Sequence, residues 1–426
     1  MRLFILLFLS TFSFSLMAQF QVGWRTDAYA GINSAIANPA LPARTDYAWD
    51  INLAEGTGFL ANNYGYFSNT SVLELFRLRN AEPAFVHERD LSAGETPNDN
   101  TLVYEFYTED EHFMETMVTA MGPSFSVRVS PLARVGLFTR FQMMGMATHV
   151  DQDVGYDSWI RIADDLDFDM ERMRLMSAAW AEVGLNYSQG IETNLGILTL
   201  GLNVRRLWGE RGAYAINNDR FTISKVTDYI GLRGADFDID AAFSNNVLET
   251  EVNTDPSGKG WGFDLGFLYQ IEEGDNFFRW EIGAALLNVG RINFDGQLHN
   301  YNASEIQEVI TADYEDYELD DGADALVQQF SEDIFGNALG SLRGDNFTIG
   351  LPTTLSLNTS YRFNEYIRIE ANWLTSLASF GPQLTNNSVL SLTPRVDRYW
   401  WGVGMPVSWY NGNQLRLGLA ARLGPV

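Results

Sequence analysis

Residues 261–290 read WGFDLGFLYQIEEGDNFFRWEIGAALLNVG, and their pattern sets the architecture of the chain. In the first part every second position is bulky and apolar: Trp261, Phe263, Leu265, Phe267 and Tyr269. A polar turn at residues 272–276 follows, and the run from Phe278 repeats the alternation. A period of two residues predicts two β-strands with unlike faces, joined as a hairpin.

The second face of this hairpin does not suit water. It carries Gly262, Asp264 and Gly266 in one strand, and Arg279 and Glu281 in the other. A soluble sheet hides its apolar face under a second layer and puts charge on its free face. Here the second face is small, rich in glycine and sparsely charged, while aromatic residues stand near the ends of the apolar stripe. This combination indicates a wall that faces lipid.

Comparable runs recur at residues 46–53, 125–143, 183–205 and 355–423. Short turns such as residues 130–133 contrast with long excursions, which is the asymmetry of membrane barrels. We therefore predict an all-β fold, a transmembrane antiparallel outer-membrane β-barrel of about 12–14 strands. The alternative, a soluble periplasmic sandwich, is disfavoured because the second face holds too little Lys and Glu.

Two excursions, residues 150–176 and 299–344, are rich in acid and should form long loops. Apolar residues at helical spacing predict a short helix on each. These are Ile160, Ala163 and Leu166 in the first, and Leu326, Phe330, Ile334 and Phe335 in the second. A divalent-cation site is the less favoured interpretation, because the spacing of an EF-hand is absent.

The N-terminus predicts export. Met1-Arg2 is a short basic start, residues 3–16 are apolar except for small hydroxyl residues, and Ala18 is a small residue at a suitable cleavage point. Residues 1–18 therefore form a predicted signal peptide. A membrane-spanning helix is the weaker alternative, because a span needs about 20 apolar residues.

Composition narrows the class further. The absence of Cys excludes a disulfide framework and a thiolate metal site. A formal charge of -27 argues against nucleic acid as a partner. A mean hydropathy of -0.13 excludes a helical membrane protein but allows a barrel, whose lumen side is polar. The chain has four histidines, and none lies in a Ser-bearing motif: His87, His112, His149 and His299. An outer-membrane hydrolase is therefore the least favoured function, and we expect no enzyme activity, cofactor or metal.

Asn38-Pro39-Ala40 ends a stretch rich in small residues ahead of the first strand. Asn before Pro favours a turn. This lead resembles the N-terminal segment of the long-chain fatty acid transporter family of outer-membrane barrels and of its relatives in Bacteroidota. The resemblance implies that residues 19–44 tuck into the barrel as a hatch-like plug, with Asn38, Pro39 and Ala40 as the plug motif, and that residues 45–426 form the barrel.

Three further motifs look like an uncharacterised family of Bacteroidota outer-membrane proteins related to that transporter type. They are residues 288–292, residues 351–355 and residues 392–396. This resemblance extends from Ala30 to the C-terminus and implies no catalytic residues. Val426 ends the chain without the terminal aromatic residue common in such barrels, which points to a truncated closing strand.

Ionisable side chains at inward strand positions are candidates for lining a path or for bracing a plug, and bracing is the favoured interpretation. They are Asp264, Arg279, Glu281, Arg368, Glu370, Arg416 and Arg422. Arg205-Arg206 near Trp208 marks either a basic spot in the lumen or a membrane interface.

The family resemblance and the aromatic content imply a channel or transporter for hydrophobic or small amphipathic solutes. Its expected partners are outer-membrane lipid and a hydrophobic small molecule. The alternative is a non-transporting barrel, a scaffold or shuttle in surface-protein export or envelope assembly with an envelope protein as partner. The long acidic loops fit this alternative equally well.

Overall fold

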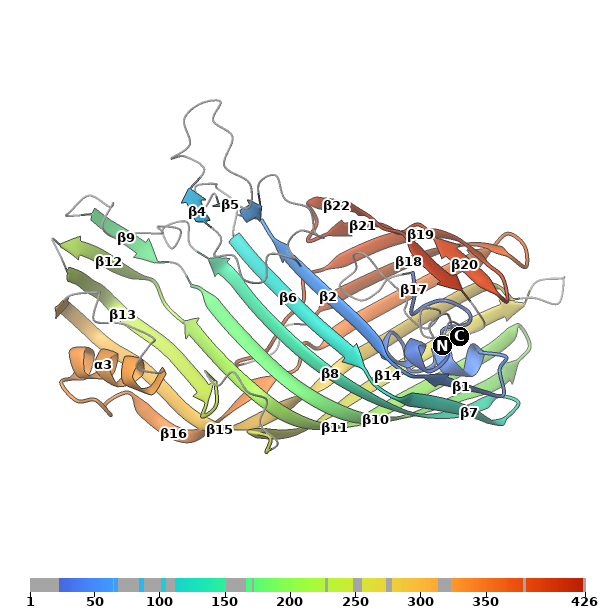
Figure 1. The fold of residues 1–426 in the computed structure, drawn as a ribbon, viewed down its shortest axis with the longest axis horizontal. Coiled ribbons are helices and arrows are strands. Elements are labelled where there is room, and N and C mark those ends of the chain that lie inside the picture. The colour runs from blue at the N-terminus through green and yellow to red at the C-terminus, as the bar shows by residue number, and fades with distance from the viewer. Residues whose placement is uncertain are drawn as a thin grey trace, which may run out of the picture.

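The computed structural model describes residues 23–63, 65–67, 84–87, 101–104, 112–150, 166–170, 172–226, 229–247, 255–272, 278–312, 323–377 and 381–423. The predicted signal peptide lies outside these residues. A 20-stranded sheet, antiparallel in its ladders, forms the wall of a β-barrel, and β3 (Gly65–Phe67), β5 (Thr101–Tyr104) and β4 (Ala84–His87) form a separate small sheet. Residues 23–44, which we call the hatch, lie inside the curved wall near one end (Figure 1).

Around the hatch, each strand pairs with its neighbour in chain order. Four wall strands are interrupted and consist of two parts each: β1 (Trp49–Asn52) and β2 (Glu55–Asn62), β6 (His112–Met121) and β7 (Ser124–Ser130), β20 (Trp401–Gly404) and β21 (Val407–Tyr410), and β22 (Gln414–Leu417) and β23 (Ala420–Leu423). Around the wall the order is β1/β2, β6/β7, β8 (Ala133–Val150), β10 (Arg174–Thr193), β11 (Gly196–Asn217), β14 (Gly258–Glu272), β15 (Phe278–Ala312), β17 (Thr354–Arg362), β18 (Ile367–Ser376), β19 (Val389–Asp397), β20/β21 and β22/β23.

The other end of the barrel, which we call the distal half, continues with further strands. These are β9 (Leu166–Met170), β12 (Phe221–Val226), β13 (Tyr229–Ser244) and β16 (Leu342–Gly350). β13 pairs with the C-terminal parts of β11 and β15, and β12 pairs with β9. β15 is therefore long enough to serve both halves of the barrel.

The first and last strands meet through side chains. Within residues 23–63 and 381–423, no backbone ladder joins β1–β2 to β22–β23. Gln414 Nε2 donates to the Asn62 carbonyl at 3.4 Å, and the Arg416 guanidinium lies 5.3 Å from the ring centre of Phe59. Nearby, the ring of Phe59 lies 5.5 Å from that of Tyr410, and the Tyr410 hydroxyl donates to Glu115 of β6 at 2.6 Å. Among the described residues the seam is thus bridged by side-chain contacts rather than by paired strands.

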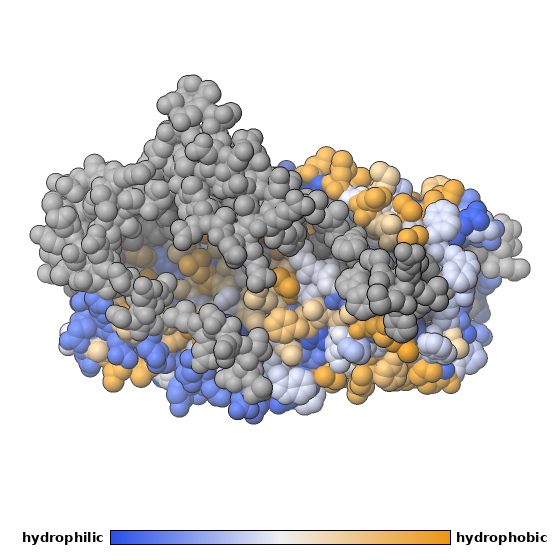
Figure 2. Space-filling model, in the orientation of Figure 1, coloured by the Kyte–Doolittle hydropathy of each residue, from blue (hydrophilic) through white to orange (hydrophobic). Residues whose placement is uncertain are grey.

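The outer face of the wall around the hatch is apolar, as the alternation in residues 261–290 predicts. Leu265 is 57% exposed and Phe263 is 43% exposed, whereas Asp264 between them is buried. The same alternation runs around the wall through Ile51, Val127, Leu185, Leu200, Ile282, Trp373, Leu392, Val403 and Leu417, all of which are exposed. Figure 2 shows hydrophobic residues gathered over the hatch end and hydrophilic ones over the end that carries α3 (Ala323–Phe335).

A bulge in β15 reverses this arrangement. The ladder with β14 shifts register between Phe263 and Leu265, and Asn288 takes a positive φ of 57°. Before the bulge the apolar Ile282 faces outward, but after it Ile292 and Phe294 are buried inside while their neighbours Arg291 and Asn293 are exposed. An extra residue in one strand shifts every later side chain to the opposite face. Residues 288–292, one of the three family motifs of the sequence, therefore form a bulge within a strand that continues to Ala312.

Both predicted excursions are partly strand. β8 extends to Val150, and Leu166, expected on a helix, begins β9; the other two residues expected there, Ile160 and Ala163, lie outside the described residues. Residues 299–312 continue β15 and pair with β13, so His299 lies in a strand and not in a loop. Acidic composition resembles that of a loop, but a partner strand satisfies the backbone of these segments all the same.

The helix expected in the second excursion is confirmed as α3. Its Phe330, Ile334 and Phe335 pack beside Tyr301 of β15, and the Tyr301 hydroxyl donates to the Val327 carbonyl at 3.0 Å. None of the described helices is long and apolar enough to cross a membrane.

Candidate functional site

The interior of the barrel, which has two unlike zones, is the candidate site. Around the hatch the inner face is polar and ionic, and in the distal half it is apolar. The β15 bulge separates the two zones, since it turns the inner face from Glu281 and Gly283 to Ile292 and Phe294.

The hatch is compact because two short 3₁₀ helices and a side-chain turn organise it. These are η1 (Gly31–Ile36) and η2 (Leu41–Arg44). Between them Asn38 Oδ1 accepts the Ala40 N–H at 2.9 Å, which closes an Asx turn around Pro39. Asn38 Nδ2 donates to the Phe267 carbonyl of β14 at 3.0 Å, and Asn186 Nδ2 donates to the Pro39 carbonyl at 3.0 Å. The Asn-Pro-Ala motif therefore forms direct hydrogen bonds with two strands of the wall.

Glycines in the wall make this close contact possible. A Cβ at Gly201 would lie 2.1 Å from the Pro39 carbonyl carbon, and one at Gly266 would lie 2.2 Å from Asn38 Oδ1. Neither distance leaves room for a methyl group. The small inner face of the opening hairpin is thus explained by the backbone that lies against it.

All three charged side chains of the hatch pair with the wall. Arg25 meets Glu55 of β2 at 3.0 Å. Arg44 meets Glu281 of β15 at 2.8 Å and also donates to the Thr26 and Asp27 carbonyls. These pairs are buried, so they hold the hatch in one orientation.

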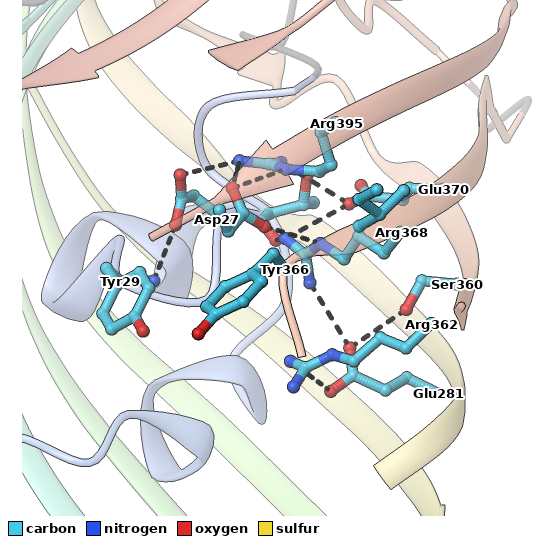
Figure 3. Close-up of polar contacts among 12 residues, drawn as sticks. Asp27, Tyr29, Glu281, Ser360, Arg362, Tyr366, Arg368, Glu370 and Arg395 are labelled. Atoms are coloured by element: carbon cyan, nitrogen blue, oxygen red, sulfur yellow. Dashed lines mark hydrogen bonds and ion pairs between the residues drawn. The ribbon is translucent and has the colours of Figure 1, made fainter. Parts of the chain in front are cut away.

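Asp27 is the third charge, and it lies in an arginine-rich cluster (Figure 3). Its carboxylate meets Arg395 at 2.7 Å and Arg422 at 3.4 Å, and Arg368 Nη2 donates to the adjacent Thr26 carbonyl at 2.7 Å. Burial acts to raise the pKa of Asp27, but the nearby guanidinium groups outweigh it and lower the pKa below its usual 3.8. The hatch carboxylate therefore stays charged at neutral pH.

The cluster around Asp27 is balanced by wall carboxylates. Asp397 lies 3.0 Å from Arg368 and 3.0 Å from Arg395, and Glu370 lies 3.7 Å from each of these arginines. Buried ions require partners on several sides, because each is removed from water. The hatch thus adds one carboxylate to a charge network that spans β18, β19 and β23.

A second buried network lies under the bulge. Arg205 bridges Asp264 at 2.8 Å and Glu182 at 2.9 Å, and Glu182 also meets Arg140 at 2.7 Å. Asp264 Oδ1 accepts the Asn288 N–H at 2.6 Å. The carboxylate of Asp264 therefore fixes the bulge that divides the polar zone from the apolar one.

The apolar zone is a packed cluster inside the distal half. Three methionines and four aromatic residues lie in it beside aliphatic ones, and Trp180, Leu207 and Phe294 are almost fully buried. Its members are Met144, Met146, Met176, Ala178, Trp180, Leu207, Tyr214, Ile216, Ala242, Ile292, Phe294, Phe347, Ile349, Leu351 and Leu384. We call these residues the apolar cluster.

The predicted site residues fall into separate groups. Glu281, Arg368, Glu370 and Arg422 belong to the networks that contact the hatch, and Asp264 belongs to the network at the bulge. The remaining two are partly exposed: Arg279 Nη1 lies 3.5 Å from the Tyr361 hydroxyl, and Arg416 lies 3.9 Å from the ring centre of Tyr410. A role in lining a path stays a prediction for all seven.

The sequence did not reveal most of the residues that pair with the seven predicted lumen residues. Arg25, Asp27 and Arg44 carry no strand pattern, so nothing in the sequence pairs them with the wall. The sequence predicts that Arg205-Arg206 marks either the lumen or an interface, and the two adjacent arginines divide these roles. Arg205 is buried inside, whereas the Arg206 guanidinium lies 5.1 Å from the ring centre of Trp261 on the outer face.

Among the described residues, no three His, Asp or Glu side chains are arranged to hold a metal ion. His299 instead lies between Ser341 and Gln297, at 2.9 Å from each, and is buried. Because Ser341 is also fully buried, this Ser-His pair presents no nucleophile to a substrate.

Comparisons with known proteins give one family and several distant structures. The family model described as a family of unknown function (DUF5723) matches residues 39–426. No curated protein sequence matches the chain. Similar solved structures include a deltaS2S3 mutant of the monoaromatic hydrocarbon channel TodX, with 12% identity, a TM-score of 0.35 and 94% of each chain covered.

Two further structures are toluene transporters. TodX of Pseudomonas putida is 11% identical with a TM-score of 0.33, and covers 94% of this chain and 93% of its own. TbuX of Ralstonia pickettii is 8% identical with a TM-score of 0.24, and covers 92% of this chain and 91% of its own. These TM-scores are below 0.5, so the function proposed next rests on the geometry of this chain alone.

Proposed function

For this chain, which belongs to the DUF5723 family of unknown function, we propose a role as an outer-membrane β-barrel that carries hydrophobic or small amphipathic solutes. The observation that carries the proposal is the apolar cluster. It lies inside the distal half of the barrel, and the outer face of the same wall around the hatch is apolar as well. An apolar interior is the environment into which a hydrophobic solute transfers favourably from water.

The location in the outer membrane is supported by the two faces of the wall. Around the hatch, exposed Leu265, Leu200 and Trp373 give an apolar outer surface, which would be unfavourable in water and suits lipid. On β15 beyond the bulge the outward residues Arg291 and Asn293 are polar and exposed. The membrane boundary on this side is proposed to lie near Trp261 and Arg206, because Trp and Arg favour the interface.

Residues 1–18 are proposed to direct export and to be removed, and residues 19–44 to act as a removable plug. The proposed partners are outer-membrane lipid and a hydrophobic small molecule. No catalytic role is proposed, since the buried Ser341 and His299 do not form an accessible site.

Close packing between the hatch and the wall favours a second candidate, a non-transporting barrel that serves as a scaffold or shuttle for an envelope protein. A cavity of about 20 Å³ remains where hatch, wall and bulge meet, lined by Ile36, Arg140 and Leu287 among others. That volume holds about one water molecule. A scaffold needs no path, whereas a transporter must open this region.

The experiment that separates the candidates is uptake of a hydrophobic fluorescent probe into lipid vesicles that contain the folded chain. Transport predicts a saturable uptake rate well above that of protein-free vesicles. A folded, heat-modifiable barrel that adds nothing to the rate would contradict transport and favour the scaffold, whose partner could then be sought by cross-linking in the native envelope.

A further inference from the structure

The seam between the first wall strand, β1/β2, and the last, β22/β23, is the one join around the hatch that lacks a backbone ladder among the described residues. Every other pair of neighbours in the wall order exchanges backbone hydrogen bonds, as β2 does with β6 and β21 with β22. Lipid offers no hydrogen-bond partners to the edge of an open sheet. Other contacts must therefore hold the two edges together.

The hatch contacts the first edge through an ion pair and a hydrogen bond. Arg25 meets Glu55 of β2 at 3.0 Å, and both side chains are buried. The Ile32 N–H donates to Asp50 Oδ1 of β1 at 2.7 Å. Asp50 is itself fixed by Arg134 of β8, at 2.6 Å. The β1/β2 edge is thus bound at two points by one short stretch of the hatch.

The same stretch contacts the last edge. The buried carboxylate of Asp27 lies 3.4 Å from Arg422 of β23. It also meets Arg395 of the nearby β19 at 2.7 Å (Figure 3). The Arg422 guanidinium lies 4.6 Å from the ring centre of Tyr29 as well. A carboxylate and an aromatic ring of the hatch therefore hold the final strand.

Three tyrosines extend this bridge at the hatch end of the barrel. Tyr29 belongs to the hatch, Tyr47 precedes β1, and Tyr399 lies between β19 and β20. The ring centre of Tyr29 lies 5.9 Å from that of Tyr47 and 6.2 Å from that of Tyr399, and the last two are 6.0 Å apart. Because Tyr47 and Tyr399 come from opposite sides of the seam, the three rings join these sides where the hatch lies.

We infer that residues 25–32 of the hatch, which we call the clasp, close the seam of the barrel. The clasp holds β1/β2 on one side and β23 on the other. Docking of the clasp and closure of the wall are therefore one equilibrium, and each strengthens the other because coupling between two sites is reciprocal. The later part of the hatch lies outside the clasp, since Asn38 and Arg44 contact β14 and β15, midway around the wall. This inference goes beyond the proposed function and applies equally to a transporter and to a scaffold.

Distances between spin labels test the closure without any solute. The natural chain has no Cys, so a pair of Cys substitutions gives two defined label sites. Leu60→Cys/Leu415→Cys is the seam pair, because these leucines of β2 and β22 are 59% and 60% exposed on the outer face, on either side of the seam. Leu200→Cys/Phe267→Cys is the reference pair, since these exposed residues lie opposite each other in the β11–β14 ladder.

Each end of the clasp is cut by a single substitution. Arg25→Ala removes the ion pair with β2, and Asp27→Ala removes the one with β23. In lipid vesicles we expect each variant to raise the population of long distances in the seam pair by about tenfold or more, with the reference pair unchanged. The double variant should add little, because a clasp that is free at one end no longer bridges the seam. Asn38→Ala is the matched control, since it removes a hatch contact midway around the wall.

Three outcomes would overturn the inference. One is an unchanged seam pair in both Arg25→Ala and Asp27→Ala. Another is equal separation of the seam pair and the reference pair, because the whole wall would then have loosened rather than the seam. The third is equal opening of the seam in Asn38→Ala, since closure would then not depend on the clasp in particular.

A covalent closure tests the reciprocal effect and covers the case in which a hatch variant does not fold. A bismaleimide that joins the Leu60→Cys/Leu415→Cys pair holds the seam shut while the hatch keeps its natural sequence. Hydrogen exchange of residues 25–32 should then slow by about fivefold or more relative to the unjoined pair, and the same reagent on the reference pair should change nothing. Unchanged exchange in the joined chain would overturn the coupling. Neither experiment contains a solute, so a failure of probe uptake would count against the proposed function only.

Discussion

Asp27 of the hatch and Arg395 of β19 form a buried ion pair of 2.7 Å although they lie 368 residues apart in the sequence. The contact joins a segment with no strand pattern to a strand near the end of the chain. Arg422 of β23 approaches the same carboxylate at 3.4 Å. The position of the hatch is thus set by charges that the wall supplies from distant parts of the sequence.

Asp27→Ala should loosen the hatch. The change leaves Arg395 and Arg422 without the carboxylate that they share, and removal of one partner from a buried pair costs about 3–5 kcal/mol. Hydrogen exchange of residues 23–44 should accelerate by about a hundredfold or more. Asp219→Ala is the control, because Asp219 pairs with Arg172 at 3.1 Å on the surface, where such a pair contributes about 0–1 kcal/mol. Equal protection in both variants would contradict this role of Asp27.

Acid should release the hatch at lower pH than a free aspartate would require. The pKa of Asp27 is lowered from 3.8 when the hatch is docked, so the undocked hatch binds more protons. The contribution of Asp27 to docking is therefore complete above pH 3.8 and is lost as pH falls through the lowered value. Hydrogen exchange of residues 23–44, corrected for intrinsic rates, should increase only below pH 3.8. In Asp27→Asn the exchange should be fast throughout, and the part of the pH dependence due to Asp27 should vanish.

Gly201→Ala should displace the hatch without changing any charge. The new methyl group would overlap the backbone at Pro39, and backbone cannot move aside as a flexible side chain can. Overpacking of this kind costs about 1–3 kcal/mol. Gly56→Ala is the matched control in another wall strand, because a Cβ there meets nothing within 4 Å. Hydrogen exchange of residues 23–44 should rise in the first variant and not in the second.

Phe294→Ala should destabilise the whole barrel. Phe294 is fully buried in the apolar cluster, and truncation of such a side chain costs about 3–5 kcal/mol. Phe267→Ala should cost less, since Phe267 is 37% exposed on the outer belt, where lipid can fill the vacated space. Urea unfolding of the two variants in lipid vesicles measures the difference. Equal free energies of unfolding would contradict the interior role of the apolar cluster.

The wall of the barrel could be predicted because its signal is local. Alternation in residues 261–290 places Trp261, Leu265 and Ile282 on one face, and the structure places all three outward. The turn at Asn411-Gly412 is likewise local, since both residues take positive φ, as a tight hairpin turn requires. Period and turn chemistry act within a few residues, so the sequence reports them directly.

The contents of the lumen could not be predicted in the same way. Residues 381–388 read as an ordinary polar loop, yet Thr385 contacts Met146 and Asn387 contacts Glu115, each more than 200 residues earlier in the sequence. The reversal at Asn288 was equally hidden. A bulge depends on which residues the partner strand brings opposite, and here the partner is Asp264, whose carboxylate holds the Asn288 N–H.

That bulge gives β15 something like a reading frame. Before Asn288 the strand turns apolar side chains outward and the charged Glu281 inward. After Asn288 it turns polar side chains outward and the aromatic Phe294 inward. Loss of the single residue Asn288 would put the far portion out of phase: Ile292 and Phe294 would turn toward the solvent, and Arg291 and Asn293 would enter the apolar cluster. A deletion at this position should therefore be far more damaging than any substitution there, just as a frameshift is worse than a missense change.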